Sequence, residues 1–395
     1  MPLIPLSWLG EHVELPAGLT AEQLAADLVR VGLEEEEVHG AAVTGPLVVG
    51  RVLSLVKEPQ KNGKVINWCQ VDVGAHNTLD DDGQPTVPRG IICGAHNFVE
   101  GDLVVAALPG TVLPGPFPIA ARKTYGHVSD GMICSTSELG LGEGGDGIIV
   151  LDPAVHPDVE PGTDAVALLG LGDEVLEINV TPDRGYCFSM RGVAREYAHS
   201  TGAAFSDPGL ATGELPAATA DGFEVVVEDD APVHGVPGCD RFVTRVVRGI
   251  DPTAPSPAWM QRRLTQAGMR PISLAVDVTN YVMLDLGQPL HAYDLSTLVA
   301  PVVVRRATAG ERLITDSAGG RGARVLGLAG VMGGAETEVS GTTTNVLVEA
   351  AHFDQVSVAR TARRHRLPSE AAKRFERGVD PRLADVAAQR VVDLL

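Results

Sequence analysis

The stretch "VINWCQVDVG", residues 65–74, is a short β-like run that closes on a glycine. Three runs of the same texture lie around it, separated by turn residues: "LVVGRVLSLVK" at 47–57, "GIICGAHNF" at 90–98 and "DLVVAALPG" at 102–110. Many short strands with Gly and Pro between them are typical of a small barrel or sandwich. Residues 41–155 are therefore predicted to form a compact β domain.

Helical segments flank this β-rich part. Before it, Thr20 is an expected N-cap with Gln23 three residues later, which is the pattern of a capping box. After it, residues 173–203 run from a strand through a Pro-Asp turn into a helix. The Ala-, Gly-, Asp- and Pro-rich residues 204–235 are interpreted as a linker, and a larger α+β region follows them.

The composition limits the class of protein. A chain of 395 residues is expected to fold into two to four domains. Its net charge of −20, from 31 basic and 51 acidic residues, excludes binding to nucleic acid by general charge, so RNA contact requires local basic patches. Five scattered cysteines without a Cys-x-x-Cys pair, no membrane-length apolar window and no signal peptide favour a reduced, cytoplasmic protein that makes no membrane contact.

Two polar residues stand in apolar surroundings. Glu349 lies in "NVLVEAAHFD", which has the character of a buried strand, where an unpaired carboxylate is strongly disfavoured. It either forms a salt bridge with an arginine among residues 360–377 or accepts a hydrogen bond from a ligand's hydroxyl or amine. His291, in "DLGQPLHAYD", is either a satisfied core imidazole or one wall of a site near Thr279 and Asn280.

Other kinds of site are excluded by their motifs. The glycine-rich residues 327–339 lack the ending of a Walker loop and the spacing of a dinucleotide fingerprint, so nucleotide binding there is rejected. Cys93 and His96 offer half of a zinc site without a second half, and no metal site is predicted. The strongly basic residues 360–380 form either a charged helix pair or a surface that faces RNA or a partner.

Together the motifs resemble the N-terminal half of the β subunit of bacterial phenylalanyl-tRNA synthetase. The resemblance runs almost end to end, with the motifs in the family's order. The stretches that carry it are "PLSWLGEHVEL", "KVINWCQVDVG", "IICGAHNF", "KTYGHVSDGMICSTSELGLG", "TNYVMLDLGQPLHAYDL", "LGLAGVMGGAETEVS", "VEAAHFD" and "ARRHRLPSEAAKRFERGVDP".

The resemblance implies a multidomain α+β fold. Residues 1–40 and 156–203 would form a small split α+β domain, and residues 41–155 an inserted tRNA-binding OB-fold barrel. Residues 204–395 would form a larger editing domain of the B3/B4 type. The family's subunit is longer than this chain, which stops on two leucines, so we expect a truncated chain.

The resemblance also implies a reaction, the hydrolytic editing of Tyr-tRNA(Phe). Tyrosine is phenylalanine plus one hydroxyl, and a hydrophobic pocket rejects an added hydroxyl by only about 10²-fold. A second site that requires the hydroxyl would remove the error. Glu349 would accept the tyrosine hydroxyl in that site, and correct phenylalanine would leave the carboxylate unpaired.

The family's functional positions fall on specific residues of this chain. The implied catalytic residues are His291, Glu349, Thr279, Asn280 and Ser369, and the implied substrate-binding residues are Ala329, Gly330 and Ala371. Residue 369 is serine where the family has threonine, so the hydroxyl is kept. The tRNA contacts are expected at Lys57, Lys61, Lys64, Arg122 and Lys123, unless these are solvated residues on a strand edge.

Partners and cofactors follow from the same resemblance. The implied partners are the synthetase α subunit, in an α2β2 heterotetramer, and tRNA(Phe). The full enzyme would use ATP and Mg²⁺ for ligation on the α subunit, and this portion would need no cofactor. The alternative is a non-enzymatic scaffold that positions tRNA and has an inactive pocket, but the presence of both Glu349 and His291 favours editing.

Overall fold

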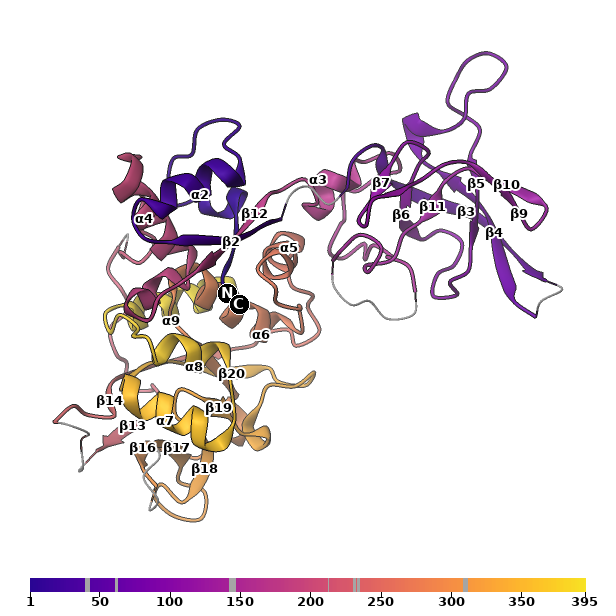
Figure 1. The fold of residues 1–395 in the computed structure, drawn as a ribbon. Helices are drawn as coiled ribbons and strands as arrows, with labels where there is room; N and C mark the ends of the chain where they lie inside the picture. The colour runs from indigo at the N-terminus through magenta and orange to yellow at the C-terminus, as the bar shows by residue number, and fades with distance from the viewer. Residues whose placement is uncertain are drawn as a thin grey trace. The chain divides into compact units, whose positions relative to one another are not determined.

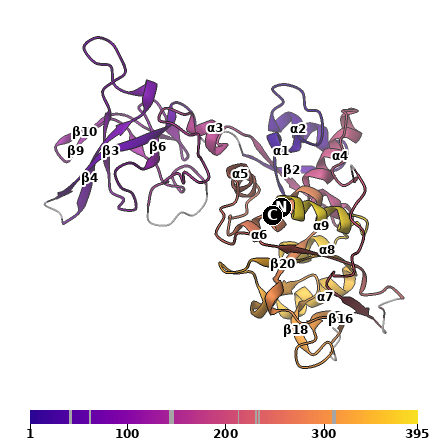
Figure 2. The same cartoon turned by 180° about the vertical axis from the view of Figure 1, so that it is seen from behind.

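The computed structural model describes residues 1–39, 43–60, 63–141, 147–211, 213–229, 232, 235–307 and 312–395. These residues form two compact units, which Figure 1 and Figure 2 show from opposite sides. Unit 1 contains Met1–Val38, Leu176–Ser256 and Ala267–Leu395, and unit 2 contains His39–Val175 and Pro257–Gln266. Both units contain helices and strands, so the predicted mixture of α and β structure is confirmed.

Unit 2 is built on a five-stranded antiparallel sheet in the order β11-β6-β3-β4-β5. The Ile92 amide of β5 donates to the Ser129 hydroxyl (3.0 Å), and the Asp130 amide donates to the Gly90 carbonyl (2.8 Å). Because these partners directly precede β11, the two edges of the sheet approach each other and the sheet is nearly closed. The strands are β3 (Leu47–Pro59), β4 (Val65–Asp72), β5 (Arg89–Cys93), β6 (Leu103–Ala107) and β11 (Met132–Ile133).

The long strand β3 allows this closure. Its first residues pair with β6 and its later residues with β4, and the register shifts between Val52 and Ser54. Such a bulge bends a strand and increases its twist, so the two ends of β3 can pair with different strands around a barrel. The shorter elements of unit 2 are η1 (Gly74–His76), β7 (Val112–Leu113), β8 (Phe117–Pro118), β9 (Arg122–Thr124), β10 (His127–Ser129), α3 (Ala165–Leu169) and α5 (Ala258–Gln266).

The N-terminal part of unit 1 combines a small sheet with helices. Strand β12 (Val175–Asn179) lies between β1 (Leu3–Pro5) and β2 (Glu34–His39). The predicted capping box is confirmed, because the Gln23 amide donates to the Thr20 hydroxyl (3.3 Å) and the Thr20 amide donates to Gln23 Oε1 (3.1 Å). The helices are α1 (Leu6–Leu9), α2 (Ala21–Val29), η2 (Pro182–Cys187) and α4 (Met190–Thr201).

Two further sheets make up the rest of unit 1. The antiparallel sheet β14-β20-β15 has its central strand β20 (Asn345–Phe353) between β14 (Cys239–Arg248) and β15 (Leu290–Asp294). The second sheet has the order β13-β16-β17-β18-β19. Its strands are β13 (Val225–Glu228), β16 (Val302–Arg306), β17 (Arg312–Asp316), β18 (Arg324–Leu328) and β19 (Met332–Gly333).

Helices complete this part of unit 1, and one apolar core joins them to the sheets. The core contains Tyr293 of β15, Leu326 of β18, Phe353 of β20 and Phe375 of α8. It therefore brings β15, β20, the β18–β19 segment and α8 together around one region. The helices are α6 (Leu274–Leu286), η3 (Leu295–Thr297), η4 (Ala335–Thr337), α7 (Gln355–His365), α8 (Glu370–Phe375) and α9 (Leu383–Leu394).

Candidate functional site

A cavity of about 380 Å³ opens in unit 1 where β15, β20, α6, α8 and the β18–β19 segment meet. Its wall includes polar side chains on otherwise apolar elements. Few precisely placed polar groups in an apolar cavity are typical of small-molecule sites. The lining residues used below are Asn280, His291, Tyr293, Gly330, Gly333, Glu349, Ser369 and Ala371.

Strand register places a carboxylate and an imidazole side by side in this wall. Strands β15 and β20 are antiparallel, and His291 is the direct partner of Glu349. Directly opposed residues project to the same face of a sheet, as do residues two apart in one strand. Tyr293 therefore joins His291 and Glu349 on that face, although the sequence alone had not singled it out.

Glu349 is buried, with 6% of its surface exposed. The Tyr293 hydroxyl donates a hydrogen bond of 2.6 Å to Glu349 Oε2. Burial raises the pKa of the Glu349 carboxyl to about 7, and the hydrogen bond from Tyr293 acts in the opposite direction. The partner of Glu349 is thus a tyrosine, and the alternative of a salt bridge with an arginine among residues 360–377 is wrong.

His291 presents a nitrogen without a partner. Its Nε2 is buried and has no hydrogen bond to any described residue. Burial lowers the pKa of the imidazole to about 4, so the ring is neutral at neutral pH. The ring meets Tyr293 edge to face, with 4.4 Å between centroids. Gly333 also lies against the ring, since an added Cβ there would come within 2.6 Å of the imidazole.

The segment between β18 and β19 is held in place by α8. Ser369 is the N-cap of α8, where its hydroxyl accepts from the Ala372 amide (3.0 Å) and donates to the Val331 carbonyl (2.8 Å). Gly330 precedes Val331 with φ +71, and an added Cβ would lie 2.9 Å from Phe353. Ser369 therefore acts on the geometry of the wall, and Gly330 permits its close packing.

The structure brings most of the predicted pocket residues together. Asn280, His291, Glu349, Ser369, Gly330 and Ala371 all line the cavity. Thr279 and Ala329 are not among the lining residues. The Thr279 hydroxyl donates to the Val276 carbonyl of its own helix (2.8 Å), and Ala329 lies in the apolar core. The missed residue, Tyr293, lies two residues after His291, and only the observation that both belong to strand β15 places it on the same face.

The predicted tRNA contacts lie on two hairpins of unit 2. Lys57 lies on β3 and Lys64 just before β4, while Arg122 and Lys123 lie on β9. All four side chains are exposed. Lys61 lies outside the described residues. Figures 1 and 2 show the β3–β4 and β9–β10 hairpins projecting on the same side of unit 2.

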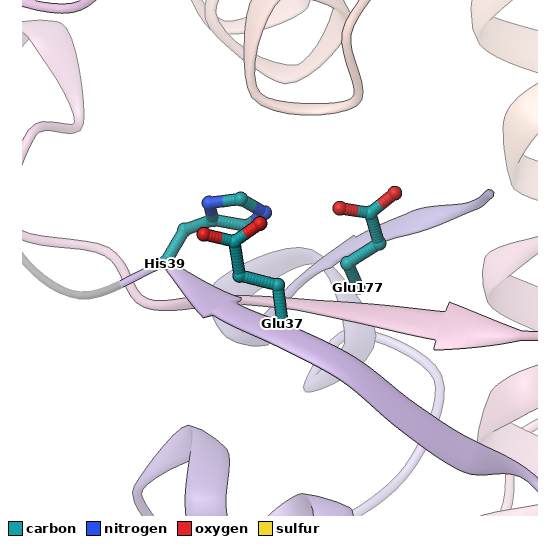
Figure 3. Close-up of side chains that lie close together, drawn as sticks. All are labelled: Glu37, His39 and Glu177. Carbon is teal, nitrogen blue, oxygen red and sulfur yellow. The ribbon is translucent and has the colours of Figure 1, made fainter.

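A group of possible metal ligands lies elsewhere, on neighbouring strands. Glu37 and His39 of β2 lie beside Glu177 of β12, with the nearest ligand atoms within 4.8 Å of one another (Figure 3). Glu177 already forms an ion pair of 3.6 Å with the amino group of Met1. Exposed acidic groups often gather in this way without a metal, so we assign no function to the group.

No described helix combines the length and the apolar character needed to cross a membrane.

Two family models match the chain. The model of the B3/4 domain matches residues 238–395, which contain the cavity described above. The model of the putative tRNA binding domain matches residues 47–164, which contain the nearly closed sheet. The tRNA-binding match thus falls in unit 2, and the B3/4 match falls in unit 1 apart from residues 257–266.

Relatives match over the whole chain. The phenylalanine–tRNA ligase β subunit of Bifidobacterium longum is 57% identical over 425 residues, which cover 100% of this chain and 49% of that protein. The Leifsonia xyli protein of the same name is 59% identical over 413 residues, covering 99% and 48%. The chain thus spans about half the length of the curated relatives it matches.

Solved structures also match, among them an N-terminal fragment of the phenylalanyl-tRNA synthetase β subunit from Pyrococcus horikoshii. It is 14% identical over 49% of this chain and 62% of that one, with a TM-score of 0.25, which supports no argument about the fold. The family is shown instead by the sequence identity with the bacterial proteins. By that identity, the chain belongs to the phenylalanine–tRNA ligase β subunit family.

Proposed function

We propose that this chain binds tRNA(Phe) through unit 2 and hydrolyses Tyr-tRNA(Phe) in the cavity of unit 1. The observation that carries the proposal is the buried carboxylate of Glu349, which lines the cavity and already accepts a hydrogen bond from a phenol, that of Tyr293. An environment that satisfies one phenol donor at Oε2 has the chemistry to accept a second at Oε1. The substrate's tyrosine side chain would supply that second donor.

This arrangement would discriminate by requiring the hydroxyl. Leaving a buried acceptor without a hydrogen-bond donor costs about 1–3 kcal/mol, because the acceptor has lost its bound water and no other donor replaces it. Phenylalanine entering the cavity would strip water from Glu349 and return no hydrogen bond. Tyrosine would return one, so the error would be bound and the correct product disfavoured.

Hydrolysis in this proposal depends on positioning rather than on a strong base. A histidine whose pKa is about 4 has little tendency to take a proton from water at neutral pH. Its unpartnered Nε2 can instead orient a water or the ester, with the amide of Asn280 on the same wall. Water would add to the ester carbonyl, and the tRNA ribose hydroxyl would leave with a proton.

The finer organisation is also part of the proposal. The sheet β1-β12-β2 joins residues from both sides of the β-rich segment, which supports a split N-terminal domain with an inserted OB-type barrel. We place the chain in a cytoplasmic α2β2 enzyme with the α subunit as partner. Ligation with ATP and Mg²⁺ is assigned to the α subunit, and neither site is assigned to this chain.

The test is single-turnover hydrolysis of Tyr-tRNA(Phe), with Phe-tRNA(Phe) as the control substrate. Wild-type chain and the Glu349→Ala variant, which lacks the acceptor, would be compared alone and assembled in the α/β enzyme. Selective loss of Tyr-tRNA hydrolysis in the variant supports editing by this pocket. Absence of hydrolysis by the wild type in both forms would refute editing and leave the tRNA-positioning scaffold as the function.

A further inference from the structure

We infer that Tyr125, at the tip of the β9–β10 hairpin, is a stacking platform for an unpaired base of tRNA. Arg122 and Lys123 on β9 would hold the adjoining phosphates. The inference rests on the proposed binding of tRNA by unit 2, and it names one contact that would produce that binding. Tyr125 is outside the set of residues that the sequence motifs single out for RNA contact.

The backbone at the tip is the first observation. Thr124 pairs with His127, so Tyr125 and Gly126 alone form the loop. Both have positive φ, 47° for Tyr125 and 89° for Gly126, as in the type I′ turns that close two-residue hairpins. Asn or Gly is favoured at the first of these positions, and a bulky residue there is strained. Backbone strain of this kind is often kept at functional positions, so the strained turn points to a function for the Tyr125 ring.

The second observation is that the pair of residues closing this loop is anchored to the sheet through His127. The His127 ring stacks on Trp68, with centroids 4.2 Å apart and an interplanar angle of 14°. His127 Nε2 also lies 3.0 Å from Glu58 Oε1. Trp68 in turn lies over Gly90 of β5, where an added Cβ would come within 2.2 Å of the indole. The tip is therefore presented by a packed support, although 41% of the Tyr125 surface is exposed.

The third observation is the local charge. Within the described part of the chain, no acidic side chain forms an ion pair with Arg122 or Lys123. Two acids beside this hairpin already have partners, since Glu58 contacts His127 and Asp130 contacts Arg89. The tip thus combines one exposed aromatic ring with two available cations.

The acidic loop of unit 2 lies at the other end of the same strands. That loop, which contains Asp80, connects the end of β4 to the start of β5. The β9–β10 hairpin runs from Asp130, beside Gly90 at the start of β5, to His127, beside Glu58 near the β3–β4 turn. The tip of the β9–β10 hairpin therefore lies away from the acidic loop, at the end of the strands that carries Lys57 and Lys64 (Figure 1).

Charge complementarity selects RNA as the occupant. Aromatic rings stack on bases of any sequence, and neighbouring cations neutralise phosphates, which is the usual combination in proteins that bind single-stranded nucleic acid. A protein partner would need a larger apolar surface, whereas the hairpin face beside Lys123 offers Val128 as its exposed apolar side chain. We therefore commit to an unpaired base of tRNA and treat a protein partner as an outcome of the test.

The test uses the full-length β subunit assembled with its α partner, and deacylated tRNA(Phe) as the probe. Tyr125→Asn relieves the turn strain and removes the ring, so the melting temperature should rise while tRNA affinity falls by about 5- to 100-fold. Tyr125→Phe should keep the affinity of the wild type. Phe117→Asn, which removes another exposed aromatic ring of unit 2, should leave affinity unchanged.

Salt dependence separates the ring from the cations. The slope of log Kd against log salt concentration should be unaltered in Tyr125→Asn and should decrease by about 0.7–0.9 in Lys123→Ala. Unchanged tRNA affinity in Tyr125→Asn, or an equal loss of affinity in Phe117→Asn, would overturn the proposed stacking of a base on Tyr125 but leave the proposed tRNA binding by unit 2 standing. A loss of α-subunit affinity with intact tRNA binding would assign the tip to a protein partner. A wild type that does not bind tRNA would overturn the proposed tRNA binding as well.

Discussion

The cavity of unit 1 and the two basic hairpins of unit 2 use polar groups in opposite ways. Glu349 and His291 lie in the wall of a cavity, their pKa values are strongly shifted by burial, and their positions follow from strand register. Lys57, Lys64 and Lys123 have exposed side chains that remain in water. Selectivity for one hydroxyl requires the first arrangement, while attraction of a phosphate backbone needs only the second.

The largest difference between the cavity and the basic hairpins should appear in the pH dependence of the free energy of unfolding. The folded-state pKa of Glu349, about 7, lies above its ordinary value of 4.5. Its protonation therefore stabilises the fold fully below pH 4.5, and this contribution is lost as the pH rises to 7. Relative to Glu349→Gln, the wild type should lose about 3 kcal/mol of unfolding free energy over that range. Denaturant unfolding at several pH values measures this, and Lys123→Gln, an exposed control, should show no such trend.

Selectivity should depend more on the carboxylate than on the imidazole. Glu349→Ala removes a hydrogen bond worth about 1.5–3 kcal/mol, so the ratio of Tyr-tRNA to Phe-tRNA hydrolysis should fall by about 10- to 100-fold. His291→Ala should slow hydrolysis while changing this ratio less. Single-turnover rates on both substrates provide the measurement. Equal changes in the ratio for the two variants would contradict the assigned roles.

Tyr293→Phe sharpens the comparison within the cavity. The variant keeps the ring in the core but removes the donor to Glu349 Oε2, which holds down the pKa of that carboxyl. The pKa should rise further, so the pH–rate profile for Tyr-tRNA hydrolysis should move to higher pH. Stability should fall by about 1 kcal/mol. A profile identical to the wild type's would show that Tyr293 has only a packing role.

The smallest effect is expected from single cations of unit 2. Lys57→Ala should weaken tRNA binding by only a few-fold at physiological salt, because an exposed cation contributes through counterion release alone. Filter binding at several salt concentrations would measure it. A loss of tRNA affinity of about 10- to 100-fold, as large as the expected change in the hydrolysis ratio of Glu349→Ala, would mean that Lys57 makes a specific contact with tRNA. That result would contradict the proposed difference between the two regions.

Local features of the fold were predictable from the sequence, and long-range ones were not. The capping box of Thr20 and Gln23 and the alternation of short strands in residues 41–155 depend on neighbours in the chain. For α9, an apolar face of Leu383, Val386, Val391 and Leu394-Leu395 was predicted, and the structure buries Leu383 and Val391 but not Val386 or the two final leucines. It also buries Ala384 and Ala388, against Val243 and Ala350 of the sheet, because small side chains let the helix approach closely.

The candidate site shows the same division. Six of the residues predicted from the resemblance to the family line the cavity. The hydrogen-bond partner of Glu349 could not be predicted in this way, because Tyr293 lies 56 positions earlier in the chain. Identifying it requires knowing which strand lies beside β20. Thr279 does not line the cavity for a local reason, since a helix turns neighbouring side chains by about 100° and, of the two residues, Asn280 is the one that reaches the cavity.

The pairing of β15 with β20 also sets a limit on how this protein can change in evolution. A one-residue deletion at the start of β15 would preserve most of the ladder after a slip, yet it would turn His291 and Tyr293 to opposite sides from Glu349. Insertions in the exposed turn before β18 would leave that alignment untouched. Homologous chains should therefore vary in length at their turns while the distance from Gln288 to Tyr293 stays constant.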